Sequence, residues 1–174
     1  MLHGTEREWE YTYHDRIFRY GVEDIDQFRY AIRCLQRKPG SHKAVITLAD
    51  PRLDVYADGA GTHIPCLRNI SFELEDIGYA YKLNTYLHWR ARDAMHAAFC
   101  NLFGFSFLAE KAARILTQSM EKPVSVGGCV DMSDDYHVNG KDMQFLQRVL
   151  EMRGKRTSED RVWTTRELEE MING

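Results

Sequence analysis

Two stretches of alternating apolar and polar residues, joined by a short turn, constrain the fold of this chain most strongly. The first stretch has its apolar side chains at Ile70, Phe72 and Leu74, and the second alternates from Tyr81 to Trp89. A period of two is typical of strands that bury one face. The intervening Glu75-Asp76-Ile77-Gly78 segment predicts a hairpin turn, so the two strands are expected to pair antiparallel.

The hairpin brings chemically useful residues together at one end. Cys66 directly precedes the first strand, Arg90 directly follows the second, and Asn101 lies a little further along. The antiparallel hairpin is therefore expected to bring Cys66 and Arg90 to the same end. Cys66 could serve as a nucleophile, but a single cysteine is more often a small buried apolar residue.

The remaining elements follow from apolar spacing, capping residues and glycines. We expect a short strand or extended segment over residues 11–17, and a helix beginning at its cap Asp24 and ending at residues 38–40. A strand over 44–49 and a loop over 52–63 should follow. After the hairpin, a long, mostly buried helix is expected over 101–120, and then a strand over 124–132 that residues 134–136 continue. Gly127-Gly128 in that strand indicates a bulge or a close backbone approach.

A last helix is expected over 140–152. The carboxyl-terminal part, 153–174, is interpreted as a divergent charged linker with a short helix capped by Thr164 and Glu167. At 174 residues, the chain is expected to form one domain, 1–174.

Charge and hydropathy exclude several classes of partner. With 23 basic and 26 acidic residues, the formal net charge is -3, which predicts no broad attraction to nucleic acid or to an anionic membrane. The sequence contains no apolar run long enough to span a bilayer, and residues 1–9 are too polar for a secretory signal. A cytoplasmic location is therefore expected.

The four cysteines show no short paired spacing, which favours reduced thiols over disulfides. Cys34, Cys100 and Cys129 fall in core-like patterns and are interpreted as structural. The best fragment of a zinc site is His63 with Cys66, and we expect no metal site because two further ligands are missing.

Taken together, the ordered motifs resemble the thymidylate synthase and pyrimidine-nucleotide (dCMP, CMP) hydroxymethylase family, as a short divergent member. The motifs, in chain order, are Tyr11-Thr12-Tyr13, Asp26-Gln27, Pro39-Gly40-Ser41 before a strand, Pro65-Cys66, the hairpin, Arg90 with Asp93, Asn101, Gly127-Gly128 and Tyr136. The resemblance implies an α+β sandwich built on a kinked mixed β-sheet covered by helices. It also implies a homodimer formed through that sheet.

The resemblance further implies a reaction in which the Cys66 thiolate adds to C6 of a pyrimidine nucleotide. C5 then takes a one-carbon unit from 5,10-methylenetetrahydrofolate, to give a methyl or a hydroxymethyl product. The same resemblance assigns Arg90, His42 and Lys43 to the phosphate, and Asn101 to the pyrimidine edge.

By the same resemblance, Asp93 would meet the folate ring, Tyr13 would lie near the proton-removal step and Tyr136 would contact the sugar. Each of these polar residues also has an ordinary structural interpretation, such as a helix cap, an ion pair at the sheet end or a strand-edge position.

The departures from the family pattern weaken the expected phosphate grip. Leu67 replaces a histidine, Ala91 replaces a serine, and His42-Lys43 replaces a pair of arginines. Phe99-Cys100 and Asp134 also depart from the pattern. The sequence has no counterpart of the segments that carry the catalytic glutamate, the folate-stacking tryptophans and the folate-closing tail, so a second chain could be needed to complete the site. The alternative is a catalytically reduced relative that binds a nucleotide or a protein partner.

Overall fold

The computed structural model describes residues 12–54, 64–155 and 157. The chain divides into two compact units, Met1–His137 and Val138–Gly174, which are considered separately. The single domain expected from the chain length stays a prediction.

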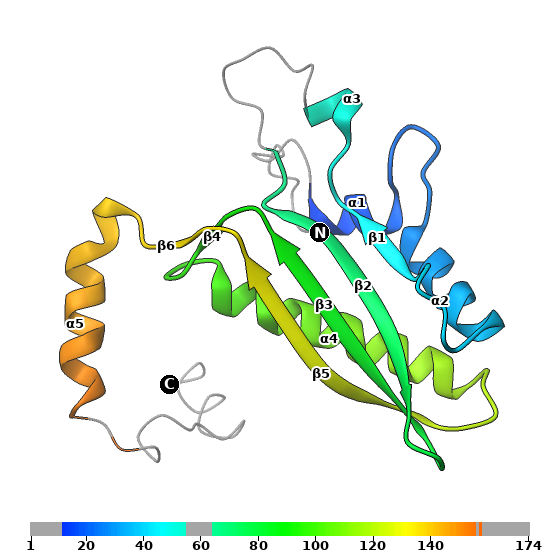
Figure 1. Cartoon of the computed structure of the whole chain (residues 1–174). Coiled ribbons are helices and arrows are strands. Elements are labelled where there is room, and N and C mark those ends of the chain that lie inside the picture. Colours follow the sequence, from blue (N-terminus) through cyan, green and yellow to red (C-terminus); the bar gives the residue numbers. More distant parts are fainter. Residues whose placement is uncertain (1–11, 55–63, 156, 158–174) are drawn as a thin grey trace, which may run out of the picture. The chain divides into compact units, whose positions relative to one another are not determined.

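The first unit contains a mixed four-stranded sheet with the order β1-β2-β3-β5 (Figure 1). Its strands are β1 (Val45–Thr47), β2 (Leu67–Asp76), β3 (Tyr81–Trp89) and β5 (Val124–Ser133). The β1, β2 and β3 strands pair antiparallel, whereas β5 runs parallel to β3. The hairpin predicted from the alternating pattern is confirmed, with Ile70 opposite Leu87 and Asp76 opposite Tyr81. Its turn lies at residues 77–80 and not at 75–78, because Glu75 and Asp76 still pair with β3.

A short second sheet lies beyond the end of β3. It pairs β4 (Arg92–Asp93) in parallel with β6 (Tyr136–His137). The expectation that residues 134–136 continue the preceding strand is therefore wrong, because β5 ends at Ser133 and the chain turns before it pairs with β4.

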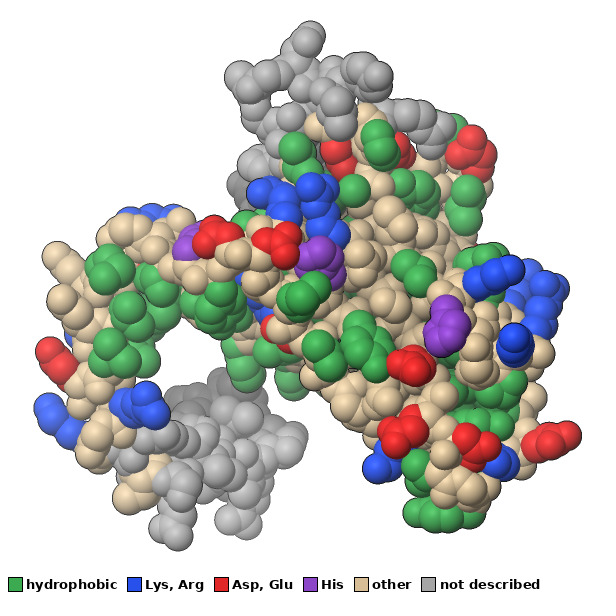
Figure 2. Space-filling model, in the orientation of Figure 1, with side chains coloured by type: hydrophobic (Ala, Val, Ile, Leu, Met, Phe, Trp, Pro, Cys, Tyr) green, Lys and Arg blue, Asp and Glu red, His purple; other side chains and the backbone are tan. Residues whose placement is uncertain are grey.

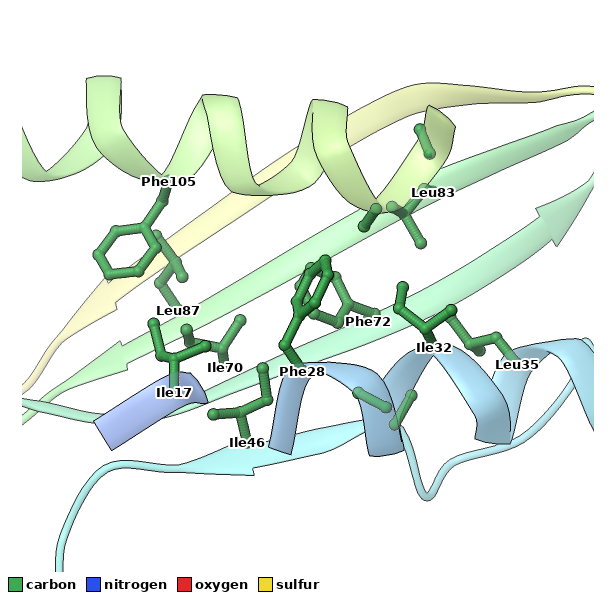
Figure 3. Close-up of a cluster of buried hydrophobic side chains, with 14 of the residues drawn as sticks. Ile17, Phe28, Ile32, Leu35, Ile46, Ile70, Phe72, Leu83, Leu87 and Phe105 are labelled. Atoms are coloured by element: carbon green, nitrogen blue, oxygen red, sulfur yellow. The ribbon is translucent and has the colours of Figure 1, made fainter. Parts of the chain in front are cut away.

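The described residues of this unit form four helices, of which α2 and α4 cover one face of the sheet (Figure 3). They are α1 (Tyr13–Phe18), α2 (Gln27–Arg37), α3 (Pro51–Asp54) and α4 (Ala98–Thr117). Phe28 and Ile32 from α2 and Phe105 from α4 pack in a single hydrophobic core with the inward side chains of β2 and β3. The mixed α+β class expected from the sequence is confirmed.

The predicted strand over residues 11–17 is wrong, because this segment forms helix α1. Thr12 caps the helix by accepting a hydrogen bond from the Asp15 backbone N–H at 3.0 Å. The consecutive residues Arg16 and Ile17 are both buried, which an alternating strand on a one-sided sheet would not allow. Capping and burial thus outweigh the aromatic, strand-like composition.

Two helix boundaries also differ from expectation. Helix α2 is capped by Asp26, which accepts from the Arg29 N–H at 2.8 Å, whereas Asp24 sits in a turn with φ 50. Helix α4 begins at Ala98, so that Asn101 lies in its first turn, and it ends at Thr117, before Met120.

The expected close backbone approach at Gly127 is confirmed. The pairing register of β3 with β5 shifts between Leu83 and Thr85, and the Gly128 N–H donates to Asn84 Oδ1 at 2.8 Å. A Cβ at Gly127 would collide with Asn84 Oδ1, the acceptor of the Gly128 N–H, and would lie 3.1 Å from the Leu83 carbonyl carbon and oxygen. Glycine at this position therefore lets β5 approach β3 closely without displacing the Asn84 side chain or the Leu83 backbone.

The second unit contains a short 3₁₀ turn, η1 (Gly140–Asp142), followed by α5 (Met143–Arg153). These elements match the helix predicted over 140–152. The first residues of the expected 52–63 loop form the end of α3, while residues 55–63, Thr164 and Glu167 lie outside the described residues. In the portion of the chain that is described, no helix has the length and apolar character needed to cross a membrane.

Candidate functional site

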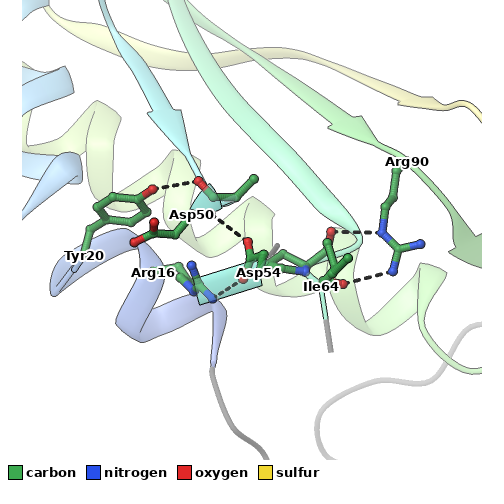
Figure 4. A network of polar contacts seen from close by, with 8 residues as sticks. Arg16, Tyr20, Asp50, Asp54, Ile64 and Arg90 are labelled. Atoms are coloured by element: carbon green, nitrogen blue, oxygen red, sulfur yellow. Dashed lines mark hydrogen bonds and ion pairs between the residues drawn. The ribbon is translucent and has the colours of Figure 1, made fainter. Parts of the chain in front are cut away.

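Arg90 binds the backbone that leads into Cys66 (Figure 4). Its side chain donates to the carbonyl oxygen of Ile64 at 3.0 Å and to that of Pro65 at 3.3 Å. Its Nη2 also lies 3.7 Å from Cys66 Sγ, and the Arg90 backbone N–H donates to the Cys66 carbonyl at 2.8 Å. The structure therefore brings the predicted nucleophile and the predicted phosphate anchor into contact, at one end of the β2–β3 hairpin.

Tyr13 joins this pair from helix α1. The Leu67 backbone N–H, directly after Cys66, donates to the Tyr13 phenolic oxygen at 3.4 Å. The ring packs edge-on against Trp89, with 6.0 Å between centroids. Burial raises the pKa of Tyr13, and the nearby Cys66 adds to that rise, whereas Arg90 opposes it. The phenol thus stays protonated near neutral pH and can donate a hydrogen bond.

Asn101 lies in a pocket of about 300 Å³ that is also lined by Tyr13. Helix α4 contributes Cys100, Gly104, Phe105 and Leu108, and helix α1 contributes the facing wall. The predicted base-recognition amide and the predicted tyrosine therefore share one pocket.

Asp93 and Tyr136 are on the paired strands β4 and β6, which follow the site end of β3. The Asp93 carboxylate accepts hydrogen bonds from the backbone N–H groups of Met95 at 2.8 Å and His96 at 3.1 Å. It therefore shapes the turn that leads into α4. Tyr136 is 60% exposed and lies opposite Arg92 in the strand register.

His42 and Lys43 are not near Cys66 within one chain. They precede β1, which runs antiparallel to β2, and the Phe72 N–H donates to the Ala44 carbonyl at 2.9 Å. Phe72 lies six positions beyond Cys66, which corresponds to about 20 Å of extended chain. His42 and Lys43 instead line a cavity of about 470 Å³ with Arg37 and Lys38.

The sequence reasoning missed a buried ion pair that links α1 to α3 (Figure 4). Arg16 Nη2 donates to Asp54 Oδ1 at 2.7 Å, and both side chains are less than 10% exposed. The other oxygen of Asp54 accepts from the Asp50 N–H at 2.7 Å. Neither residue carried a sequence signal, because partners 38 positions apart are paired only by the fold.

A second unpredicted network surrounds Arg92, which is 2% exposed. Its guanidinium lies 4.4 Å from the Trp89 ring centroid, donates to the Ala98 carbonyl at 2.7 Å and forms an ion pair with Asp131. Asp131 also accepts from Trp89 Nε1 at 2.6 Å. This network fixes the end of β3 and the start of α4, the two elements that carry Arg90 and Asn101.

Of the three cysteines predicted to lie in the core, Cys34 is partly buried and packs against it, as expected. The prediction is wrong for Cys100 and Cys129, which are exposed. Cys100 lies on the pocket side of α4, and Cys129 is on the edge strand β5, where burial and the nearby Asp131 raise its pKa. His63 lies outside the described residues.

Two curated archaeal proteins match the sequence, and both are named "Putative thymidylate synthase". The protein from Methanocaldococcus jannaschii is 30% identical over 118 residues, covering 66% of this chain and 51% of its own length. The protein from Methanosarcina barkeri is 29% identical over 144 residues, covering 83% of this chain and 59% of its own length. The chain thus spans about half the length of these relatives. No protein-family model matches the sequence. The two matches support a thymidylate synthase-like relationship.

Proposed function

We propose that this chain transfers a one-carbon unit to C5 of a pyrimidine nucleotide, with Cys66 as the nucleophile. The observation that carries the proposal is the contact between Cys66 Sγ and the Arg90 guanidinium, with the Tyr13 phenol at the adjacent Leu67 N–H. A thiol, a fixed cation and a protonated phenol at one sheet end suit addition to an electron-poor ring. The archaeal relatives, by their printed name, support the same chemistry.

In the proposed reaction, the Cys66 thiolate forms a bond to C6 and pushes the C5–C6 π electrons toward C5 and the C4 oxygen. C5 would then bond to the one-carbon unit and lose its proton, and the bond from that unit to its folate nitrogen would break, which leaves a methylene on C5. The bound folate would supply this unit and the hydride of a methylation, whereas water would supply the hydroxyl of a hydroxymethylation. Addition of the hydride or of water to the methylene would re-form the C5–C6 double bond and expel the Cys66 thiolate.

Arg90 and Asn101 would hold the nucleotide. Arg90 is partly buried, so its charge acts through less solvent than that of a surface arginine. Its hydrogen bonds to Ile64 and Pro65 hold the guanidinium rigidly beside the thiol. Asn101, in the pocket with Tyr13, offers an amide donor and acceptor to the base edge. Tyr136, exposed at the same sheet end, would contact the sugar.

5,10-Methylenetetrahydrofolate would supply the one-carbon unit. Among the described residues, we assign Asp93 to the binding of this folate. One oxygen of its carboxylate accepts hydrogen bonds from two backbone N–H groups. In this proposal, the Asp93 carboxylate would accept a hydrogen bond from the folate ring.

We further propose a homodimer through the open face of the sheet. Helices α2 and α4 cover only one face, and Figure 2 shows charged, histidine and hydrophobic side chains intermixed on the other. Val130 and Met132 are exposed there on β5, in register with Tyr86 and His88. In such a dimer, His42 and Lys43 would act on the phosphate bound by the partner. Alternatively, a different second chain would complete the folate-binding wall of the site. For the fold, we propose the α+β sandwich of the thymidylate synthase family.

Tritium release from [5-³H]dUMP, dCMP, UMP and CMP tests the proposal, with and without methylenetetrahydrofolate. We expect release from one of the four substrates by the wild-type protein and none by Cys66→Ser, while nucleotide binding persists. Equal release by both proteins would remove Cys66 from the mechanism.

The alternative is a relative that binds a nucleotide or a protein partner without chemistry. The hydrogen bonds of Arg90 favour this alternative. Its Nε and Nη2 already donate to main-chain carbonyls, so a phosphate would have to share these donors with the carbonyls or replace them. Tight binding of a pyrimidine nucleotide with no tritium release from any substrate would establish this alternative.

A further inference from the structure

A groove between helices α2 and α4 shares only Phe18 with the pocket that holds Tyr13 and Asn101. Its volume is about 370 Å³, and its apolar lining comes from Phe18 at the end of α1, Phe28 and Ile32 of α2, and Ile115 of α4. Phe28 and Ile32 extend from α2 toward the core (Figure 3). The volume falls in the range of ordinary small-molecule sites.

The rim of this groove is positively charged. Arg29 and Arg33 come from α2 and Lys111 comes from α4, against the single carboxylate of Asp26. Among the residues that the structure describes, none of these three cations has an ion-pair partner. Asp26 is already used as the cap of α2, where it accepts from the Arg29 N–H.

Lys111 lies between the charged rim and the apolar lining of the groove. Its ammonium nitrogen lies 4.9 Å from the Phe18 ring centroid and 5.6 Å from that of Phe28. A cation above two aromatic rings can remain there while it also binds an anion, because both contacts are electrostatic and use different sides of the ammonium group.

The two ends of the groove favour a compact ligand over a long peptide. At one end, Gln36 Nε2 donates to Ser119 Oγ at 2.8 Å, which links α2 to the turn after α4. At the other end, Phe18 and Phe28 pack with 5.3 Å between their centroids. A helical segment would have to displace one of these contacts to continue past the groove.

We infer that this groove binds a small apolar carboxylate, with its aromatic or aliphatic body on the partly exposed Phe18 and Ile115, above the buried Phe28 and Ile32. The carboxylate would face Lys111 and the α2 arginines. Charge complementarity selects the anion, and the apolar floor selects against a bare inorganic ion. The inference does not depend on the proposed one-carbon transfer.

Fluorescence anisotropy of naphthalene-2-carboxylate, with naphthalene-2-carboxamide as the uncharged probe, tests the inference on the full chain. We expect saturable binding of the carboxylate, about tenfold tighter than that of the carboxamide, because a charge-assisted contact is lost in the amide. Lys111→Met keeps much of the apolar stem and should weaken carboxylate binding about fivefold to tenfold, with little change for the carboxamide.

Arg114→Met is the matched control, because Arg114 is an exposed cation on the same helix that does not line the groove. It should leave both affinities unchanged. The inference is overturned if carboxylate and carboxamide bind equally well, if Lys111→Met and Arg114→Met have the same effect, or if no saturable binding occurs.

Discussion

Burial of the Tyr13 phenol raises its pKa above 10.0, which makes the stability of the protein sensitive to alkaline pH. Above pH 10 the unfolded chain releases this proton while the folded chain retains it, so the free energy of unfolding falls as pH rises toward the folded pKa. One such group contributes a slope of up to about 1.4 kcal/mol per pH unit.

Tyr13→Phe should therefore flatten the alkaline loss of stability. At pH 7 the variant should lose about 0.5–1.5 kcal/mol, because the Leu67 N–H loses its acceptor. Between pH 10 and 11, the difference in free energy of unfolding between the variant and the wild-type protein should become smaller. Urea unfolding at both pH values measures this, and Tyr79→Phe, at an exposed hairpin-turn position, serves as control. A constant gap would contradict the assignment of alkaline titration to Tyr13.

Because Arg16 and Asp54 form a buried ion pair, replacing Arg16 alone should destabilise the fold more than replacing both residues together. Arg16→Met leaves the Asp54 carboxylate buried without its guanidinium and should destabilise the fold by about 3–5 kcal/mol. Adding Asp54→Leu removes the stranded charge and should recover part of that loss. Urea unfolding of the two variants compares them, and a double variant less stable than Arg16→Met would show that the Asp54 bond to the Asp50 N–H matters more than the charge.

At the scale of elements, substitution by alanine is expected to change the free energy of unfolding in opposite directions at two glycines of the first unit. Gly127→Ala should destabilise by about 1–3 kcal/mol, because its Cβ would press on the Leu83 carbonyl group across the β3–β5 register shift. Gly104→Ala should stabilise by about 0.5–1 kcal/mol, because it is helical and nothing lies within 4 Å of its Cβ. Thermal unfolding compares them, and equal shifts in Tm would mean that the backbone approach at Gly127 relaxes freely.

The hairpin and the two covering helices were the elements that the sequence predicted best. Strands β2 and β3 each bury one face, so their alternation survives in the sequence, and α2 shows helical spacing of buried residues. Helix α1 was missed because six residues carry too little periodicity to separate a helix from a strand. The parallel β3–β5 pairing was also not predictable, because register depends on contacts distant in sequence.

In the candidate site, the contact of Cys66 with Arg90 could be predicted because both residues directly flank the hairpin strands. The hairpin pattern could not predict the position of Tyr13, because its contact with the Leu67 N–H depends on how helix α1 packs over the end of β2. The Arg92–Asp131 pair was missed for a related reason. A buried arginine and an exposed one look alike in a sequence until the strand partners are known.

At the scale of the whole molecule, the separation of His42 and Lys43 from Cys66 constrains how a complete site can form. Antiparallel pairing of β1 with β2 holds these residues near Phe72, six positions along the chain from Cys66. If they contact the substrate phosphate, the phosphate must belong to another copy of the chain. A closed two-fold dimer through the open sheet face would give two equivalent sites, each built from both chains.

Mixing inactive variants tests this arrangement directly by tritium release from the preferred substrate. Cys66→Ser and the double variant His42→Ala/Lys43→Ala should each be inactive or nearly so, but a mixed dimer has one site with both wild-type contributions. Random exchange makes about half of the dimers mixed, so activity should return to about a quarter of wild type. Cys66→Ser mixed with Arg90→Ala is the matched control and should stay inactive, because those two residues act within one chain. If both mixtures stay inactive while the His42→Ala/Lys43→Ala variant alone is also inactive, these residues act within their own chain or on its folding, and the shared phosphate site is wrong.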